Sequence, residues 1–385
     1  MKKQTILMVG GGTGGHVSPI ISLVQELESR NQKLSLEFWT DRKQYKNLKD
    51  DASLQRVKLR AISAGKLRRY ATFPLLEYLR HPILITKNLL DTLKIAFALI
   101  QSFWRLSLRR PKMIFLKGGF VCLPVGLVAG FLRIPYIIHE SDSVPGLTNR
   151  LLMKRAQVIA TGMPVECYKE FQDKMIWTGV PIGEGFRVYS DDERKALRQK
   201  YNLDSIAKIV VVTGGSQGSK NLNEVSLEIW PQLAKHNIQL VLITGKRNYK
   251  NILAQREGLE KADGLKILDY SERLWELFGL ADVVVSRSGA STLMNLVAVK
   301  KPAILVPYQK LPGGHQVRNA ELFARAGAAE MIIDKTMLEQ PQKLAKMLID
   351  LVGDKKTQVQ MCNNLNQFAR RGATQKLADL ILAQK

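Results

Sequence analysis

Three turns rich in glycine or serine each follow a short β-branched run in this 385-residue chain. Residues 10–15 (GGGTGG) follow the run 6–9, residues 214–218 (GGSQG) follow 208–213, and residues 286–292 (SRSGAST) follow 283–285. Glycine at a strand-to-helix turn lets backbone N–H groups approach an anion at the helix N-terminus. The three turns therefore favour phosphate or diphosphate binding. Tight helix packing, or a serine N-cap, is the structural alternative for each turn taken alone.

His16 follows the first of these turns directly and is the candidate catalytic residue. An imidazole with an unperturbed pKa near 6.5 can take a proton from a hydroxyl group at neutral pH. A lone histidine is also often structural, and the residues alone leave both roles open. His, Cys and Asp residues nowhere show metal-ligand spacing, and the chain has neither a GxxxxGK[ST] loop nor the usual dinucleotide fingerprint. We therefore expect no metal and no cofactor.

The elements that must position these residues form two series. Predicted strands at 6–9, 34–39, 113–116, 136–138 and 158–160 alternate with helical patterns, and the alternation restarts with strands at 208–213, 240–244, 265–268, 283–286 and 303–307. Such a βαβ rhythm predicts an α/β fold with two doubly wound parallel sheets. Glycine and proline between 177 and 186 mark the join, so we expect domains at 1–178 and 179–385. The last residues, 357–385, are predicted to be helical.

Charge points to a polyanionic partner. Lys+Arg 58 against Asp+Glu 34 gives a net charge of +24, and such a field favours nucleic acid or an anionic membrane. Two acid-free basic stretches lie between Asp51 and Glu77 and between Asp91 and Glu140. Residues 81–112 add Leu, Ile and Phe at helical spacing, which suits an interfacial membrane helix or, alternatively, a core helix with a basic end. The predicted membrane contacts are Lys66, Arg68, Arg69, Phe103 and Trp104.

Other classes of protein fit the composition less well. Three widely spaced cysteines make no disulfide framework, which predicts a reducing compartment. No signal peptide is recognisable, and no run approaches the ~20 apolar residues of a spanning helix. The expected location is therefore the cytoplasm or the surface of a membrane. No helix-turn-helix or RNP pattern is present, so we expect no nucleic-acid partner.

Four sets of residues, in order along nearly the whole chain, resemble the MurG family of peripheral glycosyltransferases. They are GGTGGHVxP at 11–19, HExxxxxGLxN at 139–149, GGSQG at 214–218 and SRSGA at 286–290, and KGGFV at 117–121 is also similar. The resemblance implies a GT-B architecture, in which two Rossmann-like domains face each other across a cleft. It implies inverting transfer of N-acetylglucosamine from UDP-N-acetylglucosamine to the 4-hydroxyl of undecaprenyl-linked N-acetylmuramoyl-pentapeptide, in peptidoglycan synthesis at the cytoplasmic face of the membrane. A diacylglycerol glycosyltransferase is the nearest alternative, followed by a UDP-sugar epimerase and a nucleic-acid binder.

The resemblance also implies the roles of single residues. His16 becomes the family's candidate base. The implied donor-binding residues are Thr13, Gly14, Gly15, Asp142, Ser216, Tyr270, Ser271, Ala290, Ser291, Thr292, Asn295 and Gln316. The chain departs from the family at Asp142, Gly183 and Asn295, where Asn, Arg and Glu are common. Asn295 puts donor affinity in question, and Arg187 and Arg287 are nearby in sequence to replace the cation missing at Gly183.

Overall fold

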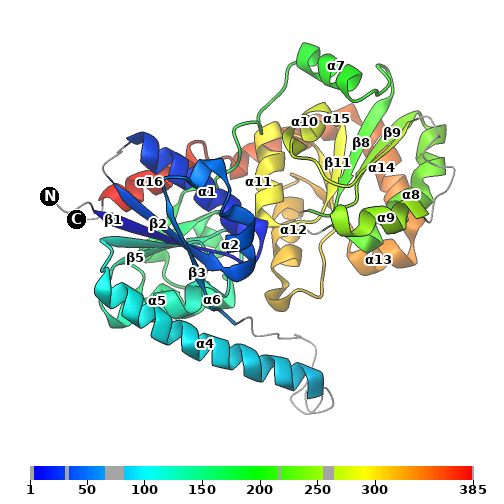
Figure 1. Ribbon diagram of the computed structural model, residues 1–385. Coiled ribbons are helices and arrows are strands. Elements are labelled where there is room, and N and C mark those ends of the chain that lie inside the picture. Colours follow the sequence, from blue (N-terminus) through cyan, green and yellow to red (C-terminus); the bar gives the residue numbers. More distant parts are fainter. Residues whose placement is uncertain (1–3, 31–33, 66–81, 216–217, 255–263, 384–385) are drawn as a thin grey trace. The chain divides into compact units, whose positions relative to one another are not determined.

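The computed structural model describes residues 4–30, 34–65, 82–215, 218–254 and 264–383 (Figure 1). Two compact units make up the chain: the first comprises 1–182, 310–315 and 370–385, and the second comprises 183–309 and 316–369. The expected boundary after residue 178 differs from this division in one main respect. The last residues of the chain return to the first unit.

A seven-stranded parallel sheet forms the centre of the first unit, in the order β3-β2-β1-β4-β5-β6-β7. Its strands are β1 (Thr5–Val9), β2 (Ser35–Asp41), β3 (Lys58–Ile62), β4 (Met113–Leu116), β5 (Tyr136–Glu140), β6 (Val158–Thr161) and β7 (Met175–Trp177). β3 and β7 add to the predicted strands. The chain builds outward from β1 to β3 and then returns to β4 on the other side of β1. Ligands of open α/β sheets bind at such a switch point, beyond the carboxyl ends of the strands.

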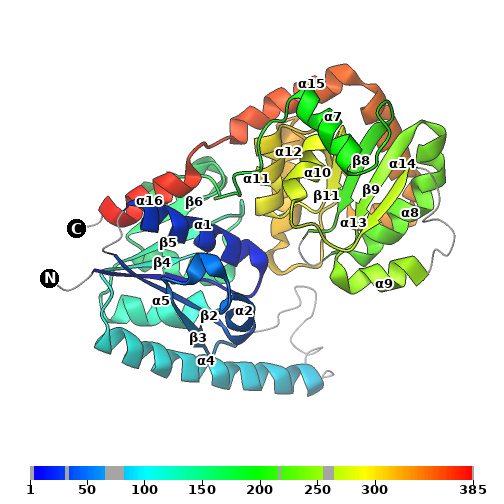
Figure 2. The ribbon, with the colours of Figure 1, turned by 45° about the horizontal axis from the view of Figure 1, so that its top comes forward.

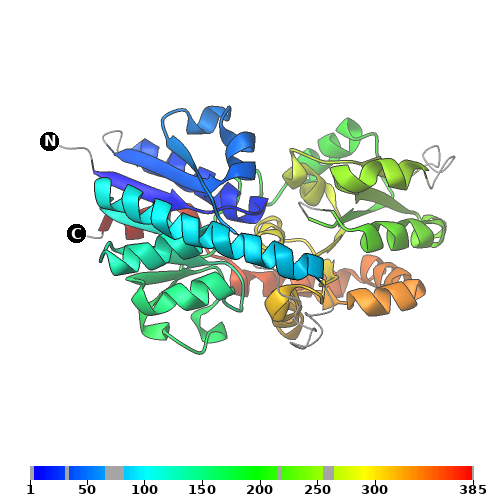
Figure 3. The ribbon, with the colours of Figure 1, turned by 60° about the horizontal axis from the view of Figure 1, so that its bottom comes forward.

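Helices cover both faces of this sheet. They are α1 (Gly14–Arg30), α2 (Arg42–Leu48), α4 (Pro82–Leu108), α5 (Cys122–Phe131), α6 (Leu147–Leu152) and α16 (Ala373–Ala383), with single 3₁₀ turns at Ala52–Leu54, Met153–Arg155, Val165–Cys167 and Gln172–Lys174. α1 and α16 lie side by side on one face (Figure 2). Figure 3 shows α4 lying across the other face, where it packs against α5.

The C-terminal helix corrects the sequence prediction for residues 357–385. The chain there forms α15 (Lys355–Asn364), a 3₁₀ turn (Leu365–Phe368) and the separate helix α16, because the backbone turns through Gly372 at φ +69°. Leu377, Ala378 and Ile381 of α16 are buried in the core of the first unit. Arg30 of α1 pairs with Asp379, which adds an ion pair to this apolar contact.

The second unit contains a six-stranded parallel sheet in the order β10-β9-β8-β11-β12-β13. Its strands are β8 (Lys208–Thr213), β9 (Ile238–Ile243), β10 (Leu265–Leu268), β11 (Val283–Ser286), β12 (Ala303–Leu305) and β13 (Glu330–Met331). Its helices are α7 (Asp191–Lys200), α8 (Lys220–Lys235), α9 (Lys246–Ala254), α10 (Leu274–Leu280), α11 (Ala290–Val299), α12 (His315–Arg325), α13 (Asp334–Glu339) and α14 (Pro341–Gly353), followed by α15. The 3₁₀ turn at Pro312–Gly314 falls within the segment 310–315 of the first unit. The switch point lies between β8 and β11, so the prediction of two doubly wound sheets is confirmed.

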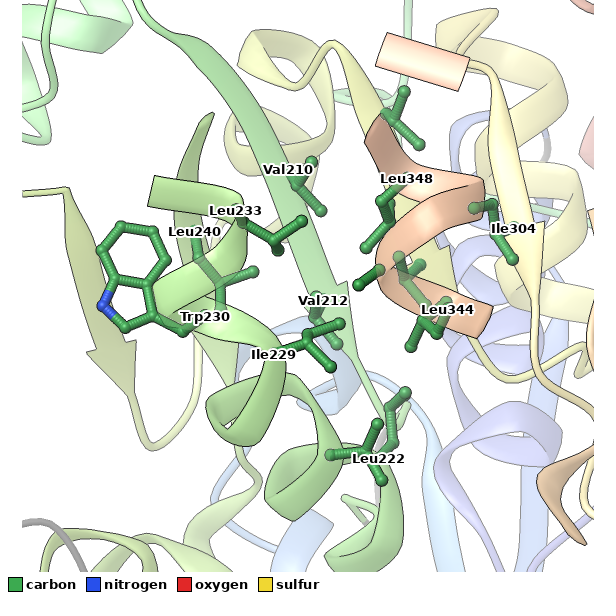
Figure 4. Close-up of a cluster of buried hydrophobic side chains, with 14 of the residues drawn as sticks. Val210, Val212, Leu222, Ile229, Trp230, Leu233, Leu240, Ile304, Leu344 and Leu348 are labelled. Atoms are coloured by element: carbon green, nitrogen blue, oxygen red, sulfur yellow. The ribbon is translucent and has the colours of Figure 1, made fainter. Parts of the chain in front are cut away.

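The core of the second unit fixes α8 and α14 against β8 (Figure 4). Val210 and Val212 of β8 are buried among Leu233 of α8 and Leu344 and Leu348 of α14. Burying a side chain of this size contributes about 1.5–3 kcal/mol. This packing sets where α8 begins, and therefore where the glycine turn 214–218 lies.

Candidate functional site

The first glycine turn, 10–15, is hydrogen-bonded to the Asp41 side chain at the end of β2. Gly12 adopts φ +87°, a conformation that favours glycine, and its N–H donates to Asp41 Oδ2 at 2.7 Å. Asp41 Oδ1 accepts from the N–H groups of Lys43 and Gln44 and caps α2. The predicted residues Thr13, Gly14 and Gly15 follow at the start of α1, where the first N–H groups of a helix have no partner within it.

A further glycine turn of the first unit, Gly118-Gly119 after β4, lies against the turn 10–15 beside His16. Gly119 follows β4 with φ +83°, and a Cβ atom there would lie 2.8 Å from the Gly11 carbonyl oxygen and 3.2 Å from His16 Cδ2. The pKa of His16 is lowered to about 4: burial is the largest cause, the Lys117 ammonium and His315 act in the same direction, and Asp142 opposes them. His16 is therefore neutral at physiological pH. Its buried Nδ1 atom has no hydrogen-bond partner within the described ranges.

Sequence reasoning gave no role to the polar chain that begins at Lys117. This side chain is only 1% exposed, and its Nζ donates to Ser141 Oγ at 2.5 Å. Ser141 Oγ lies 3.4 Å from His139 Nδ1, and His139 Nε2 lies 2.9 Å from the Gly179 carbonyl oxygen. Because a carbonyl oxygen only accepts, Nε2 carries the proton and Nδ1 accepts from Ser141. Burial holds the pKa of His139 well below its usual range, and Lys117 adds to the effect.

Glu140 ends β5 and organises the loop that follows it. Its Oε1 accepts from the Asp142 N–H at 3.0 Å, and its Oε2 accepts from the Gly146 N–H and from Asn149 Nδ2 at 3.0 and 2.9 Å. Burial raises the pKa of this carboxyl, and the Asp142 carboxylate raises it further. Asp142 is half-buried, and its carbonyl oxygen accepts from the Tyr168 hydroxyl. Its role in donor binding stays a prediction.

In the second unit, the turn 214–218 leads into α8, whose N-cap is Ser219. Gly215 and Gly218 both have positive φ. Ser216, the predicted diphosphate contact, lies outside the described residues. Ser219 Oγ accepts from the Leu222 N–H, so the capping serine stands one residue beyond the glycine turn. A helix of sixteen residues thus begins where the sequence predicts an anion site.

Arg287 is engaged within the unit. Its guanidinium pairs with Asp334 at 2.6 Å and donates to Ser219 Oγ and the Val306 carbonyl oxygen. Arg287 and Asp334 are both buried. Arg187 pairs with Glu193 and lies over the Tyr189 ring. Both arginines thus already have an acidic partner, and a role for either in place of the cation missing at Gly183 stays a prediction.

The turn after β11 presents hydroxyl groups on the first turn of α11. The N-cap is Gly289, which makes no side-chain cap hydrogen bond, so the serine-cap alternative is wrong here. Ala290 is buried, whereas Ser291 and Thr292 are half-buried. Asn295 is also half-buried and shares their face, because residues three and four apart are neighbours on a helix.

Gln316 is held beside this turn by two hydrogen bonds. Its Oε1 accepts from the Tyr308 N–H at 2.9 Å, and its carbonyl oxygen accepts from Ser288 Oγ at 2.7 Å. Asn319 Nδ2 donates to the Ser288 carbonyl oxygen and closes the arrangement. The fixed amide oxygen leaves the Gln316 NH₂ group as the donor suited to a ligand oxygen.

Tyr270 and Ser271 follow β10, as predicted, and sequence reasoning missed a neighbouring cation. The Tyr270 ring is about half exposed, and Lys246 Nζ at the start of α9 lies 4.9 Å from its centroid. The Tyr270 N–H donates to Asp269 Oδ1, which fixes the backbone at this position. An exposed ring with a cation over one face can stack against a planar ligand on its other face.

The predicted membrane contacts are partly described. Lys66, Arg68 and Arg69 lie outside the described residues, whereas Phe103 and Trp104 are exposed on α4, Trp104 by 62%. Phe131 of α5, which the sequence did not single out, is 71% exposed, with its ring 6.3 Å from that of Phe103. We call the exposed apolar side chains of these two helices the α4–α5 face: Leu89, Leu90, Leu93, Phe97, Ile100, Phe103, Trp104, Leu108, Leu127 and Phe131.

The side of α4 opposite the α4–α5 face packs on the sheet. The alternative of a core helix for residues 81–112 therefore holds for that side of the helix only. Ala98, Ser102 and Leu106 are buried, and Arg105 donates to the Ala61 carbonyl oxygen of β3. Arg109 pairs with the buried Glu37 of β2. The helix is thus fixed to the sheet by a narrow stripe and by its basic end.

Two structural features are absent from the described residues. None of the helices described is both long and apolar enough to span a membrane. In the same residues, no group of three His, Cys, Asp or Glu side chains is arranged to hold a metal ion.

Comparison with known proteins gives the family. Residues 6–161 match the glycosyltransferase family 28 N-terminal domain, and residues 209–377 match the glycosyltransferase family 28 C-terminal domain. A protein of Clostridium perfringens is 33% identical over 354 residues, 91% of each chain, and one of Clostridium kluyveri is 31% identical over 386 residues, 99% of each. Both carry the name UDP-N-acetylglucosamine--N-acetylmuramyl-(pentapeptide) pyrophosphoryl-undecaprenol N-acetylglucosamine transferase.

Solved structures agree on the fold. Acinetobacter baumannii MurG matches with a TM-score of 0.72 at 23% identity, over 99% of each chain. The UDP-GlcNAc 2-epimerase of Neisseria meningitidis matches with a TM-score of 0.66 at 14% identity, over 98% of this chain and 100% of that one. At such identities the likeness concerns the fold alone. The matched domains and the relatives above 30% identity together show that the chain belongs to glycosyltransferase family 28.

Proposed function

We propose that the chain transfers N-acetylglucosamine from UDP-N-acetylglucosamine to the 4-hydroxyl of an undecaprenyl-linked N-acetylmuramoyl-pentapeptide. The names of the relatives, at 31–33% identity over nearly whole chains, support this choice of donor and acceptor. The observation that carries the chemistry is His16, a neutral imidazole beside the two glycine turns of the first unit. The alternative is a family 28 enzyme with another acceptor, and analysis of the product distinguishes the two.

The reaction needs one displacement. The acceptor oxygen bonds to the anomeric carbon as the bond from that carbon to the diphosphate oxygen breaks, and UDP leaves with the electron pair. In this proposal His16 takes the acceptor proton, since an unprotonated imidazole is the form that acts as a base. The anomeric configuration inverts, and no covalent enzyme intermediate forms.

The second unit would hold the donor. The starts of α8 and α11 offer unpaired backbone N–H groups and the positive ends of helix dipoles, which stabilise a departing diphosphate. Ser216, Ser291 and Thr292 would add hydroxyl donors there.

Other residues would recognise the nucleoside and the sugar. Tyr270 and Ser271 would lie along the uracil, Asn295 would bond to the ribose, and the Gln316 NH₂ group would meet a sugar hydroxyl. For Thr13, Gly14, Gly15 and Asp142 of the first unit, contact with the donor stays a prediction. No metal or cofactor is needed in this scheme, because the diphosphate charge is met by backbone N–H groups.

Membrane binding would bring the acceptor to the enzyme. The α4–α5 face carries aromatic and aliphatic side chains, and the exposed Arg110 follows the end of α4. Apolar insertion combines with about 1 kcal/mol per Lys or Arg near an anionic surface. We therefore propose peripheral binding at the cytoplasmic face, with the net charge of +24 as the attraction.

The linkage of the product tests the chemistry. The purified enzyme, the radiolabelled donor and the lipid-linked acceptor should give one labelled product, with the new bond at the 4-hydroxyl and inverted configuration by NMR. A product with retained configuration, or a sugar on another hydroxyl, would contradict the proposal.

A further inference from the structure

Lys117 is a buried cation at the switch point of the first sheet. Its N–H donates to the Val9 carbonyl oxygen at 2.9 Å and so extends the pairing of β4 with β1. A Cβ atom added at Gly10 would lie 3.3 Å from the Lys117 Cβ and 2.9 Å from the His16 carbonyl oxygen, so both residues pack against this glycine. A lysine that is 1% exposed has lost its water, which costs several kcal/mol unless other groups compensate. An apolar residue would fill this place at lower cost, so the charge needs a reason.

The charged groups around Lys117 and His16 come from several elements. Glu140 and Asp142, at and after the end of β5, attract the Lys117 ammonium, while Cys122 at the start of α5 has a smaller effect. His16 faces Lys117, Asp142 and His315, and His139 on β5 faces both His16 and Lys117. Glu140 is fixed by its three donors, so it is a stationary counter-charge. Lys117 is therefore the cation of a buried cluster that includes the candidate base.

We propose that Lys117 is a positioning residue of this site, a buried cation that opposes protonation of His16 and orders the end of β5 through Ser141 and His139. A positive charge beside an imidazole disfavours the imidazolium form. The chain Lys117–Ser141–His139–Gly179 also selects the His139 tautomer, since each group can donate in one direction only. The consequence for catalysis rests on the proposed role of His16 as the base, whereas the electrostatic effect itself does not.

The pKa values agree with this assignment. The pKa of Lys117 is lowered to about 8 by burial, which the two carboxylates partly offset, so the side chain is mainly cationic at neutral pH. Burial is the first cause of the low pKa of His16, and Lys117 is the second. Removing the Lys117 charge should therefore raise the pKa of His16 without restoring its ordinary value.

The direct test is a titration of the imidazole nitrogens by NMR. Histidine labelled with ¹⁵N is incorporated into the full chain, and the His16 signal is assigned by its loss in His16→Gln. We expect His16 to stay neutral down to about pH 5 in the wild type. Lys117→Met and Lys117→Gln should each raise its pKa by about one unit, the lower end of the effect of a near charge. Lys112→Met, at the exposed residue before β4, should leave it unchanged.

Two variants keep the test valid if one fails to fold. Gln at 117 retains a donor for Ser141 and loses only the charge, so it separates charge from hydrogen bonding. A folded Lys117→Gln or Lys117→Met protein whose His16 titrates as in the wild type would overturn the proposal. Lys117→Arg should keep the wild-type titration, because it keeps the charge, and a rise there equal to that in Lys117→Met would also overturn it.

Kinetics supply the second readout. If His16 is the base, the acidic limb of the kcat/KM profile should move up by the same amount in Lys117→Met as the NMR pKa does. If the His16 pKa moves but the acidic limb of the kcat/KM profile does not, the role of Lys117 is kept and His16 is rejected as the base. An unmoved pKa would reject the role of Lys117 whatever the enzyme transfers.

Discussion

At the carboxyl end of the first sheet, Lys117, His139 and Glu140 are buried side chains of three different ionisable types. At the carboxyl end of the second sheet, Arg287 and Asp334 form a buried pair whose charges neutralise each other. The turns around them, 214–218 and 286–292, offer backbone N–H groups and hydroxyls. The first edge thus has side chains whose protonation depends on their neighbours, and the second has fixed donors. We infer that side chains at the edge of the first sheet transfer a proton, whereas the donors at the edge of the second sheet bind an anion.

The largest expected effect is at His16. His16→Ala should lower kcat by about 10²–10⁴-fold, the usual loss when a general base is removed. The KM for the donor should change little, and the circular dichroism spectrum should match that of the wild type. Activity within a few-fold of wild type would show that His16 has a structural role, and it would contradict the inferred difference between the edges of the two sheets.

The ion pair of the second edge is expected to affect stability instead. Arg287→Met leaves Asp334 buried without its cation, and breaking a buried pair typically costs about 3–5 kcal/mol. Urea unfolding measures this loss. The double variant Arg287→Met/Asp334→Leu should recover part of it, because no charge is then left unpaired. A single variant as stable as the wild type would mean that the pair does not brace the Ser219 cap.

Membrane binding is the next largest effect. Replacing Phe103, Trp104 and Phe131 with Ser should weaken binding to anionic vesicles at least tenfold, since each fully buried aromatic side chain contributes about 1.5–3 kcal/mol. Lys66, Arg68 and Arg69 to Glu should weaken it as well, and salt should weaken the wild type. Flotation with anionic and neutral vesicles measures both effects.

The matched control for this surface lies elsewhere on the molecule. Ile206→Ser removes a side chain that is 83% exposed in the second unit and should leave flotation unchanged. Equal flotation of the wild type with anionic and neutral vesicles would assign the basic excess to another partner, with nucleic acid as the first to test.

Donor contacts should give the smallest effects. Gln316→Ala and Ser216→Ala each remove a hydrogen bond worth about 0.5–1.5 kcal/mol, which predicts a rise of roughly 2- to 13-fold in the donor KM. Acceptor kinetics should stay near wild type, in contrast to His16→Ala. Asn295→Glu should lower the donor KM if this position faces the ribose. Unchanged donor KM in all three variants would move the donor site away from these turns.

Local patterns predicted most of the fold. Residues 6–9 and 208–213 are β-branched runs that end in glycine, so both strands and the turns that follow them are visible in the chain. The helix α16 could not be assigned to the first unit, because its apolar face suits either core. Its partner, α1, lies more than 340 residues earlier in the sequence, and no local pattern records that contact.

The candidate site was predicted in part for a similar reason. His16 and the glycine turns stand together in sequence, so their neighbourhood follows from one turn. Lys117 counted only as one more basic residue, because its burial depends on the packing of three strands. The Arg287–Asp334 pair joins the end of β11 to the start of α13, and no local pattern in the sequence records this contact.

The most direct test of the central claim is to identify which lipid accepts the labelled sugar. Labelled UDP-N-acetylglucosamine is incubated with the wild-type enzyme and either undecaprenyl-linked N-acetylmuramoyl-pentapeptide or diacylglycerol, and the lipid products are separated and identified by mass spectrometry. We predict that label enters the muramoyl-pentapeptide lipid, with no labelled diacylglycerol, and that His16→Ala loses this product at least a hundredfold. Label in diacylglycerol alone, or an undiminished product from His16→Ala, would contradict the account.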